Sequence, residues 1–145
     1  MSDPFDLQRF VDAQDSAGTG TSSTYASALA ELRAGRKTSH WMWFVFPQLA
    51  GLGRSATAQH FAVSGLDEAR AYLAHPVLGP RLRECAAALT GLPGTDPVAV
   101  LGSVDAQKLR SSMTLFAAAS DDPVFPAVLD QYFDGAPDPA TTQRL

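Results

Sequence analysis

The sequence has 145 residues, the length of one domain, and a chain of this size buries roughly 68–70% of the surface that it exposes when unfolded. Hydrophobic residues make up 46% of it and charged residues 18%, which excludes the disordered and fibrous classes. The formal net charge of −4 argues against a general nucleic-acid binder, because binding to phosphates depends on clustered lysine and arginine.

The sequence also indicates the cellular compartment and whether any segment could span a membrane. A single cysteine, Cys85, excludes an internal disulfide and any metal site that needs several cysteines. Residues 1–10 lack the basic, apolar and small-residue succession of a signal peptide. The longest apolar run, Trp41 to Phe46, is too short to span a bilayer. We therefore expect a cytoplasmic protein without a membrane partner.

Four Asp-Pro pairs predict helix starts along the chain. An aspartate can accept hydrogen bonds from the free amides of a first helical turn, and proline fits the first helical position, where its missing donor is not needed. The pairs are Asp3-Pro4, Asp96-Pro97, Asp122-Pro123 and Asp138-Pro139.

Apolar stripes at helical spacing predict the remaining elements. One stripe follows Pro4 and another runs from Tyr25 to a stop at Gly35. Further helices are predicted over 66–74, 78–89, 105–119 and 125–133. No run alternates apolar and polar residues for long enough to make a strand. We expect an all-α fold, a compact single domain of about six to eight short helices, with a flexible Gly/Thr/Ser connector at 16–24.

Residues 35–48, GRKTSHWMWFVFPQ, form the most unusual segment. Trp41 to Phe46 are apolar on every side of either a helix or a strand, so they must be buried all round or cover a pocket. Pro47 should end any helix here, because the residue before proline disfavours helical angles. The simpler interpretation is a central piece of the core.

The polar residues of this segment give a second interpretation. Ser39 can cap a turn that His40 begins, and Lys37 lies just before it, which favours an anion near free helix-start amides. Trp41 and Trp43 offer flat surfaces for a base or sugar ring. The segment thus also indicates a pocket for a small anionic or nucleotide-like molecule, with His40 as the candidate catalytic proton-transfer residue.

Two polar residues fall on the core face of a later predicted helix. Helical projection of residues 108–116, KLRSSMTLF, places Lys108 and Ser112 within its apolar arc. An unpaired buried ammonium is unfavourable, so Lys108 must meet a carboxylate, carbonyls, water or a ligand, unless its head reaches solvent. Ser112 could bond back to its own helix. Lys37 and Lys108 are the candidate anion contacts.

No metal or cofactor site is predicted. The three histidines have no metal-ligand spacing, and His75 before Pro76 is typical of a helix start. Cys85 lies on the apolar seam of residues 78–89, where a thiol acts as a small hydrophobic group. Residues 18–23, GTGTSS, follow no predicted strand and lack the Gly-Lys-Ser/Thr ending of a P-loop.

The chain resembles a bacterial family known as domain of unknown function 1810. The resemblance runs through LQRFVDAQ, ELRAGRKTSHWMWFVFPQLAGLGRS, LDEARAYLAHPVLGPRLREC, KLRSSMTLF and VLDQYFDGAPDPAT, in the family's order. It implies a small all-helical domain, and no activity, because none is established for the family. Two features depart from the family's pattern: the connector before Tyr25 is longer, and residues 100–108 replace the usual Phe-Gly-x-Pro-Asp.

These observations leave several functions open. We narrowly favour a non-catalytic interaction or regulatory domain. The alternative is a small-molecule binding protein or enzyme that uses Lys37, Ser39, His40, Trp41, Trp43, Lys108 and Ser112. A more remote alternative is an ADP-ribose glycosidase, since the order of the aromatic segment, LGPRL and the Met-Thr-Leu-Phe helix is similar to the NADAR family. A monomer and a dimer are equally compatible with the sequence.

Overall fold

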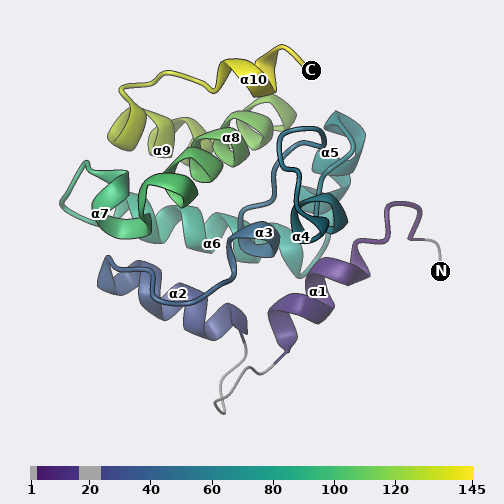
Figure 1. Ribbon diagram of the computed structural model, residues 1–145, viewed down its shortest axis with the longest axis horizontal. Coiled ribbons are helices and arrows are strands. Elements are labelled where there is room, and N and C mark those ends of the chain that lie inside the picture. Colours follow the sequence, from purple (N-terminus) through teal and green to yellow (C-terminus); the bar gives the residue numbers. More distant parts are fainter. Residues whose placement is uncertain (1–2, 17–23) are drawn as a thin grey trace.

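The computed structural model describes residues 3–16 and 24–145, and its regular structure is helical (Figure 1). Ten helices occur in the described residues: α1 (Gln8–Asp15), α2 (Thr24–Ala34), α3 (Met42–Val45), α4 (Ala56–His60), α5 (Leu66–Ala74), α6 (Leu78–Thr90), α7 (Pro97–Leu101), α8 (Ser103–Ala119), α9 (Val124–Phe133) and α10 (Pro139–Thr142). In that part of the chain, Leu49 and Val63 form an isolated bridge rather than a strand pair. The predicted all-α fold is confirmed.

The helices form one compact bundle around α6 (Figure 1). Helices α2, α5 and α9 pack against α6, α8 packs against α5, α7 and α9, and α10 lies over α8. The predicted connector, residues 16–24, lies mostly outside the described residues, which omit 17–23. Its two ends are held together, because the Thr24 amide donates to the Ser16 carbonyl at 2.8 Å.

The stripes predicted from the sequence face the core. Helix α5 covers 66–74 as predicted, and α6, α8 and α9 match their predicted segments within two residues at each end. On the first stripe, Leu7, Phe10, Val11 and even the polar Gln14 are buried. Gly35 ends α2 at a φ of +77°, a left-handed conformation that glycine adopts without strain.

The Asp96-Pro97 pair caps α7 as predicted, whereas at α9 Pro123 is itself the N-cap residue and Asp122 lies one residue before it. One carboxylate oxygen of Asp96 accepts the Val98 amide at 3.0 Å at the start of α7. One carboxylate oxygen of Asp122 likewise accepts the Val124 amide at 3.0 Å at the start of α9. These bonds satisfy amides that have no partner inside their own helix.

The helix start predicted at Asp3-Pro4 is wrong by several residues. The Asp3 carboxylate accepts the Leu7 amide at 2.8 Å, but the helix begins only at Gln8. Asp6 lies between them with a φ of +51°, in the left-handed region, and this interrupts a right-handed helix. Asp3 therefore caps a turn that leads into α1.

Helix α4 was not predicted. Its cap is clear in the structure, since the Ser55 side chain accepts the Ala58 amide at 3.0 Å. None of its five residues is buried, so no apolar stripe marked it in the sequence. A short surface helix of this kind is held by its cap and its neighbours rather than by a buried face.

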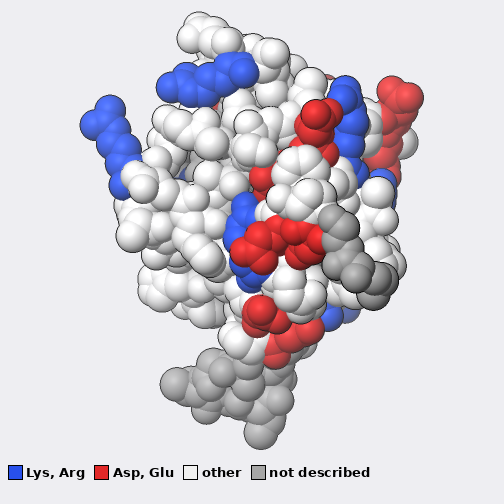
Figure 2. Space-filling model, turned by 90° about the vertical axis from the view of Figure 1, so that its right-hand side faces the viewer, with Lys and Arg blue, Asp and Glu red and all other residues white. Residues whose placement is uncertain are grey.

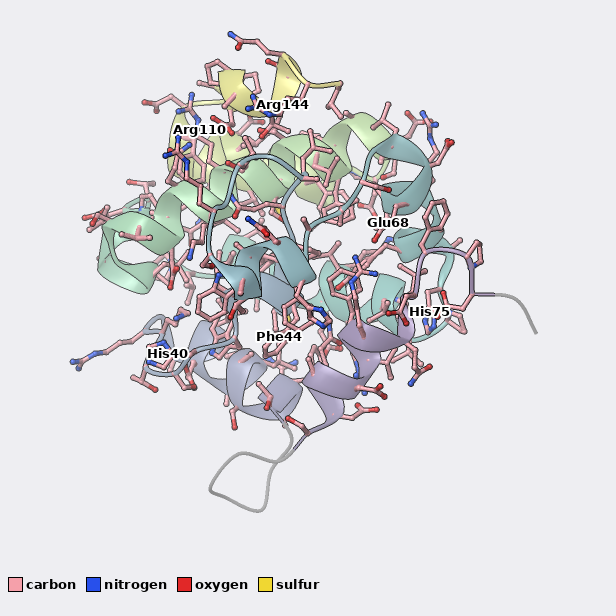
Figure 3. All side chains as sticks on the ribbon, turned by 45° about the vertical axis from the view of Figure 1, so that its right-hand side comes forward. His40, Phe44, Glu68, His75, Arg110 and Arg144 are labelled. Carbon is pink, nitrogen blue, oxygen red and sulfur yellow. The ribbon has the colours of Figure 1, made fainter. Side chains whose placement is uncertain are left out.

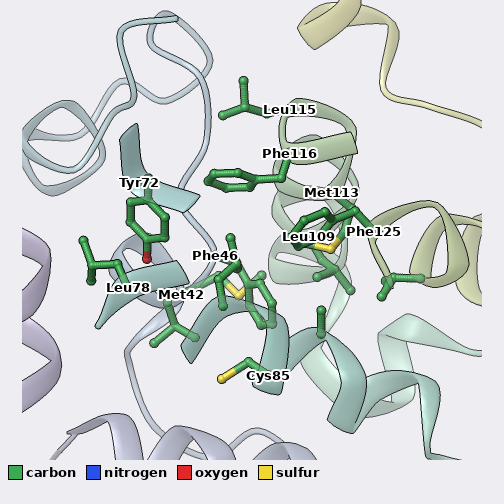
Figure 4. Close-up of a cluster of buried hydrophobic side chains, with 14 of the residues drawn as sticks. Met42, Phe46, Tyr72, Leu78, Cys85, Leu109, Met113, Leu115, Phe116 and Phe125 are labelled. Atoms are coloured by element: carbon green, nitrogen blue, oxygen red, sulfur yellow. The ribbon is translucent and has the colours of Figure 1, made fainter. Parts of the chain in front are cut away.

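The aromatic segment lies at the centre of the core (Figure 4). Met42 and Phe46 come between Tyr72 of α5 and the apolar side chains of α8, among them Met113. The four residues Trp41, Met42, Val45 and Phe46 are each at most 2% exposed. Helix α3 ends at Val45, two residues before Pro47, as expected from the restriction that proline imposes.

Candidate functional site

Glu31 shapes the loop that precedes the aromatic segment. Its carboxylate accepts the amides of Thr38 and Ser39, at 2.7 and 3.0 Å, and the indole N–H of Trp41 at 3.0 Å. The Ser39 hydroxyl donates to the second carboxylate oxygen. Burial alone would raise the pKa of Glu31, but these donors, the Ser39 hydroxyl foremost, lower it below its usual range. The loop is fixed around one anionic side chain.

Sequence reasoning missed Glu31, although one signal pointed to it. A buried tryptophan usually finds an acceptor for its indole N–H, and Trp41 was expected to be buried. Glu31 is the nearest acidic residue before it, ten positions away. The predicted cap role of Ser39 is not what the structure shows: α3 begins after Trp41 without a side-chain cap, and Ser39 instead bonds to Glu31.

Lys37, Asp105 and Lys108 form a cluster where this loop meets the start of α8. The loop is held there because the Lys37 amide donates to the Val100 carbonyl at 2.8 Å. The Lys37 ammonium lies 2.8 Å from one carboxylate oxygen of Asp105, and the Lys108 ammonium lies 3.5 Å from the other. The three side chains are 9%, 18% and 22% exposed for Lys37, Asp105 and Lys108. The cluster is partly buried and carries one uncompensated positive charge.

Each lysine of the cluster also lies against an indole ring. Lys37 Nζ is 5.2 Å from the ring centre of Trp41, and Lys108 Nζ is 4.7 Å from that of Trp43. Both distances are within the range of cation–π attraction. Trp41 is fully buried, whereas Trp43 is partly exposed. Of the two rings expected to stack on a ligand, only Trp43 reaches the surface. We call Lys37, Asp105, Lys108 and Trp43 the lysine–indole cluster.

The other predicted site residues lie in different surroundings. Ser112 is fully buried, one helical turn after Lys108, and its hydroxyl has no hydrogen-bond partner among the described residues. On the same helix, the Thr114 hydroxyl does donate to the carbonyl four residues earlier, that of Arg110. His40 is exposed near the edge of the molecule, well away from His75 and Glu68 (Figure 3). No described residue hydrogen-bonds to the His40 ring.

Other reactive or charged groups do not assemble into a second centre. In the residues that the structure describes, no three His, Cys, Asp or Glu side chains lie close enough to hold a metal. Burial raises the pKa of the Cys85 thiol to about 12, so this thiol is a poor nucleophile. Figure 2 shows acidic and basic side chains interspersed over one face of the molecule. Within the described segments, no helix is long and apolar enough to cross a membrane.

The comparisons with known proteins settle the family. Residues 4–145 match the family described as "Protein of unknown function (DUF1810)". The chain belongs to this family. It is also similar to a solved structure, that of the conserved hypothetical protein Rv1873 from Mycobacterium tuberculosis, with 49% identity and a TM-score of 0.92 over 99% of this chain and 98% of that one. No curated protein matches the chain. The family and the solved relative carry no stated activity.

Proposed function

We propose that this member of the DUF1810 family is a non-catalytic binding domain, and that its ligand is a small anion held at the lysine–indole cluster. The observation that carries the proposal is that Lys37 and Lys108 share a single aspartate. Lys37 has the close contact with Asp105, and Lys108 has the long one. A partly buried charge is stabilised by a partner of opposite sign. An anion beside Lys108 would supply that partner.

Ser112 is a buried polar residue next to the lysine–indole cluster. A buried hydroxyl without a hydrogen bond destabilises a protein by about 1–3 kcal/mol, so such a group calls for a partner. Ser112 follows Lys108 by four residues and therefore shares its side of α8. The Ser112 hydroxyl is inaccessible from the surface in this structure, so an anion beside Lys108 would reach it only after neighbouring side chains move.

The surroundings of His40 favour binding without catalysis. A general acid or base works best when a second group orients its ring. His40 is exposed, and no such group contacts it in the described residues. We therefore assign His40 no role in proton transfer, and the enzymatic alternative depends on a group that would have to move to it.

A thermal-shift screen with nucleotides, sugar phosphates and carboxylates tests the proposal. A ligand at ten times its Kd stabilises the folded state by about 1.4 kcal/mol, which raises the melting temperature of a domain this size by roughly 3–6 °C. Lys108→Met should remove most of that shift. Arg36→Met should retain it, because Arg36 is exposed and its side chain forms no hydrogen bond or ion pair with a described residue.

The same screen can contradict the proposal. If no compound raises the melting temperature, or if the Lys108 and Arg36 variants respond equally, the cluster is a purely structural ion pair. His40→Ala distinguishes a binding site without His40 from one that includes it. Unchanged binding fits the non-catalytic role, whereas a loss of binding would restore His40 to the site.

A further inference from the structure

A hollow of about 350 Å³ lies between the end of α2, the α6–α7 loop and α7. Its size is within the range of small-molecule pockets in proteins. Gly35, Leu92, Ala99, Val100 and Tyr132 are among the residues that line it. None of the residues of the lysine–indole cluster lines the hollow, so it is a separate candidate site.

The walls of the hollow are mostly apolar, and hydrogen bonds hold them in place. The Tyr132 hydroxyl donates to the Leu89 carbonyl at 2.6 Å, which directs the polar end of that side chain into the protein. Gln131 ties down the α6–α7 loop, because its side-chain amide donates to the carbonyls of Leu92 and Gly94 at 3.0 and 2.9 Å. The hollow is therefore a fixed feature of the fold.

The charge of the lining comes from one residue. Asp96 is the single charged residue among those that line the hollow. One of its carboxylate oxygens accepts the Val98 amide and caps α7, and its second oxygen has no partner among the described residues. Arg33 and Arg36 adjoin the lining residues Ala34 and Gly35 in sequence, but neither lines the hollow. A cation is thus the complementary charge at this rim.

We propose that this hollow binds a small organic cation, an ammonium group on an apolar body the size of one ring. The apolar body contacts Leu92, Val100 and the Tyr132 ring, and the ammonium pairs with the free carboxylate oxygen of Asp96. A ligand of this class has the opposite charge to that proposed for the lysine–indole cluster. Rejection of one proposal would therefore leave the other unaffected.

Three probes of similar size and different charge test this site: benzylamine, benzyl alcohol and benzoate. Binding is followed by the chemical shifts of backbone amides during titration of the full chain. We expect saturable shifts at the α6–α7 loop and α7, with affinity falling in the order benzylamine, benzyl alcohol, benzoate. Ala99→Phe should fill the hollow and remove the shifts for all three probes.

Asp96→Asn removes the charge of this residue while keeping a side chain that can cap α7. Asparagine caps a helix as well as aspartate does, so α7 should be retained. We expect benzylamine to bind about two- to fivefold more weakly to this variant, the effect of losing a partly exposed ion pair, and benzyl alcohol to bind unchanged. Asp121→Asn, at an exposed aspartate away from the hollow, should bind all three probes as the wild type does.

Three results would overturn the proposal. The first is benzoate binding as tightly as benzylamine, and the second is benzylamine binding equally to the wild type and the Asp96 variant. The third is a titration without saturable shifts at α7. The melting temperature of each variant, measured alongside, shows whether the fold is intact. If Ala99→Phe is unfolded, the Asp96 comparison alone decides.

Discussion

At the scale of single residues, one carboxylate organises the loop before the aromatic segment. Glu31 accepts bonds from two backbone amides, a hydroxyl and an indole, all within Thr38–Trp41. Hydrogen bonds to an ionised acceptor are stronger than neutral ones. The position of Lys37 in the lysine–indole cluster therefore depends on a residue whose side chain bonds to Thr38, Ser39 and Trp41 rather than to Asp105 or Lys108.

Glu31→Gln tests this role. The amide keeps the shape of the side chain but removes its charge and one acceptor, so we expect a loss of about 1.5–3 kcal/mol in the free energy of unfolding at neutral pH. Chemical denaturation followed by tryptophan fluorescence measures it. Asp12→Asn, at an exposed residue of α1, is the control and should unfold almost as the wild type does. Equal stability of the wild type and Glu31→Gln would show that the Glu31 charge is not needed to stabilise the loop.

At the scale of elements, α6 begins at a histidine cap. The Nδ1 atom of His75 accepts the amides of Val77 and Leu78, at 3.1 and 3.3 Å. This agrees with the helix-start role predicted for His75 from the proline that follows it. The next turn packs closely on α5, because a Cβ at Gly79 would lie 2.1 Å from the Leu73 carbonyl oxygen. The cap and this glycine together fix the angle between α5 and α6.

His75→Ala should therefore destabilise the domain by about 0.5–2 kcal/mol, the usual effect of losing a helix cap. His75→Asn should recover most of that loss, since asparagine places an acceptor at the same end of the helix. Urea denaturation of the two variants at neutral pH gives both numbers. If alanine is tolerated without loss, the two long bonds to Nδ1 contribute nothing to stability.

At the scale of the whole molecule, a buried aspartate joins the C-terminal segment to α8. Asp138 is 3% exposed, and one of its carboxylate oxygens accepts the hydroxyls of Ser111 and Thr141, each at 2.7 Å. Its amide donates to the Thr114 hydroxyl at 2.9 Å. Burial raises the pKa of Asp138, but the hydroxyl donors outweigh it and the net pKa is lowered.

A lowered carboxyl pKa sets the direction of the pH dependence. The folded protein holds its charge to a lower pH than the unfolded chain, whose aspartates titrate near pH 4, so this stability is present above about pH 4 and is lost as the pH falls through the folded value. Asp138→Asn should cost about 1.5–3 kcal/mol at pH 7. We expect the difference from the wild type to shrink in acid.

Thermal melts of the wild type and Asp138→Asn at a series of pH values measure this difference. Asp121→Asn, at an exposed residue without a described partner, is the control and should follow the wild type throughout. A difference that stays constant from neutral to acid pH would mean that the charge of Asp138 does not contribute.

The sequence by itself determined the elements of this protein. The stripes of α1, α2, α5, α6, α8 and α9 are visible because burial of one face requires apolar residues at helical spacing, and the caps at Asp96 and Asp122 are local chemistry. The family could be recognised for the same reason, since its motifs are contiguous. Helical projection also placed Ser112, which is buried, and Lys108, which is partly buried, on the core side of α8.

Only the tertiary structure decided what those residues meet. Lys37 and Asp105 are sixty-eight positions apart, and no local rule pairs them; their contact exists because the α2–α3 loop packs against the start of α8. The hollow beside Asp96 likewise draws its walls from four separate elements. A period in sequence reports which face of a helix is buried, whereas the partner across that face follows from how the whole chain packs.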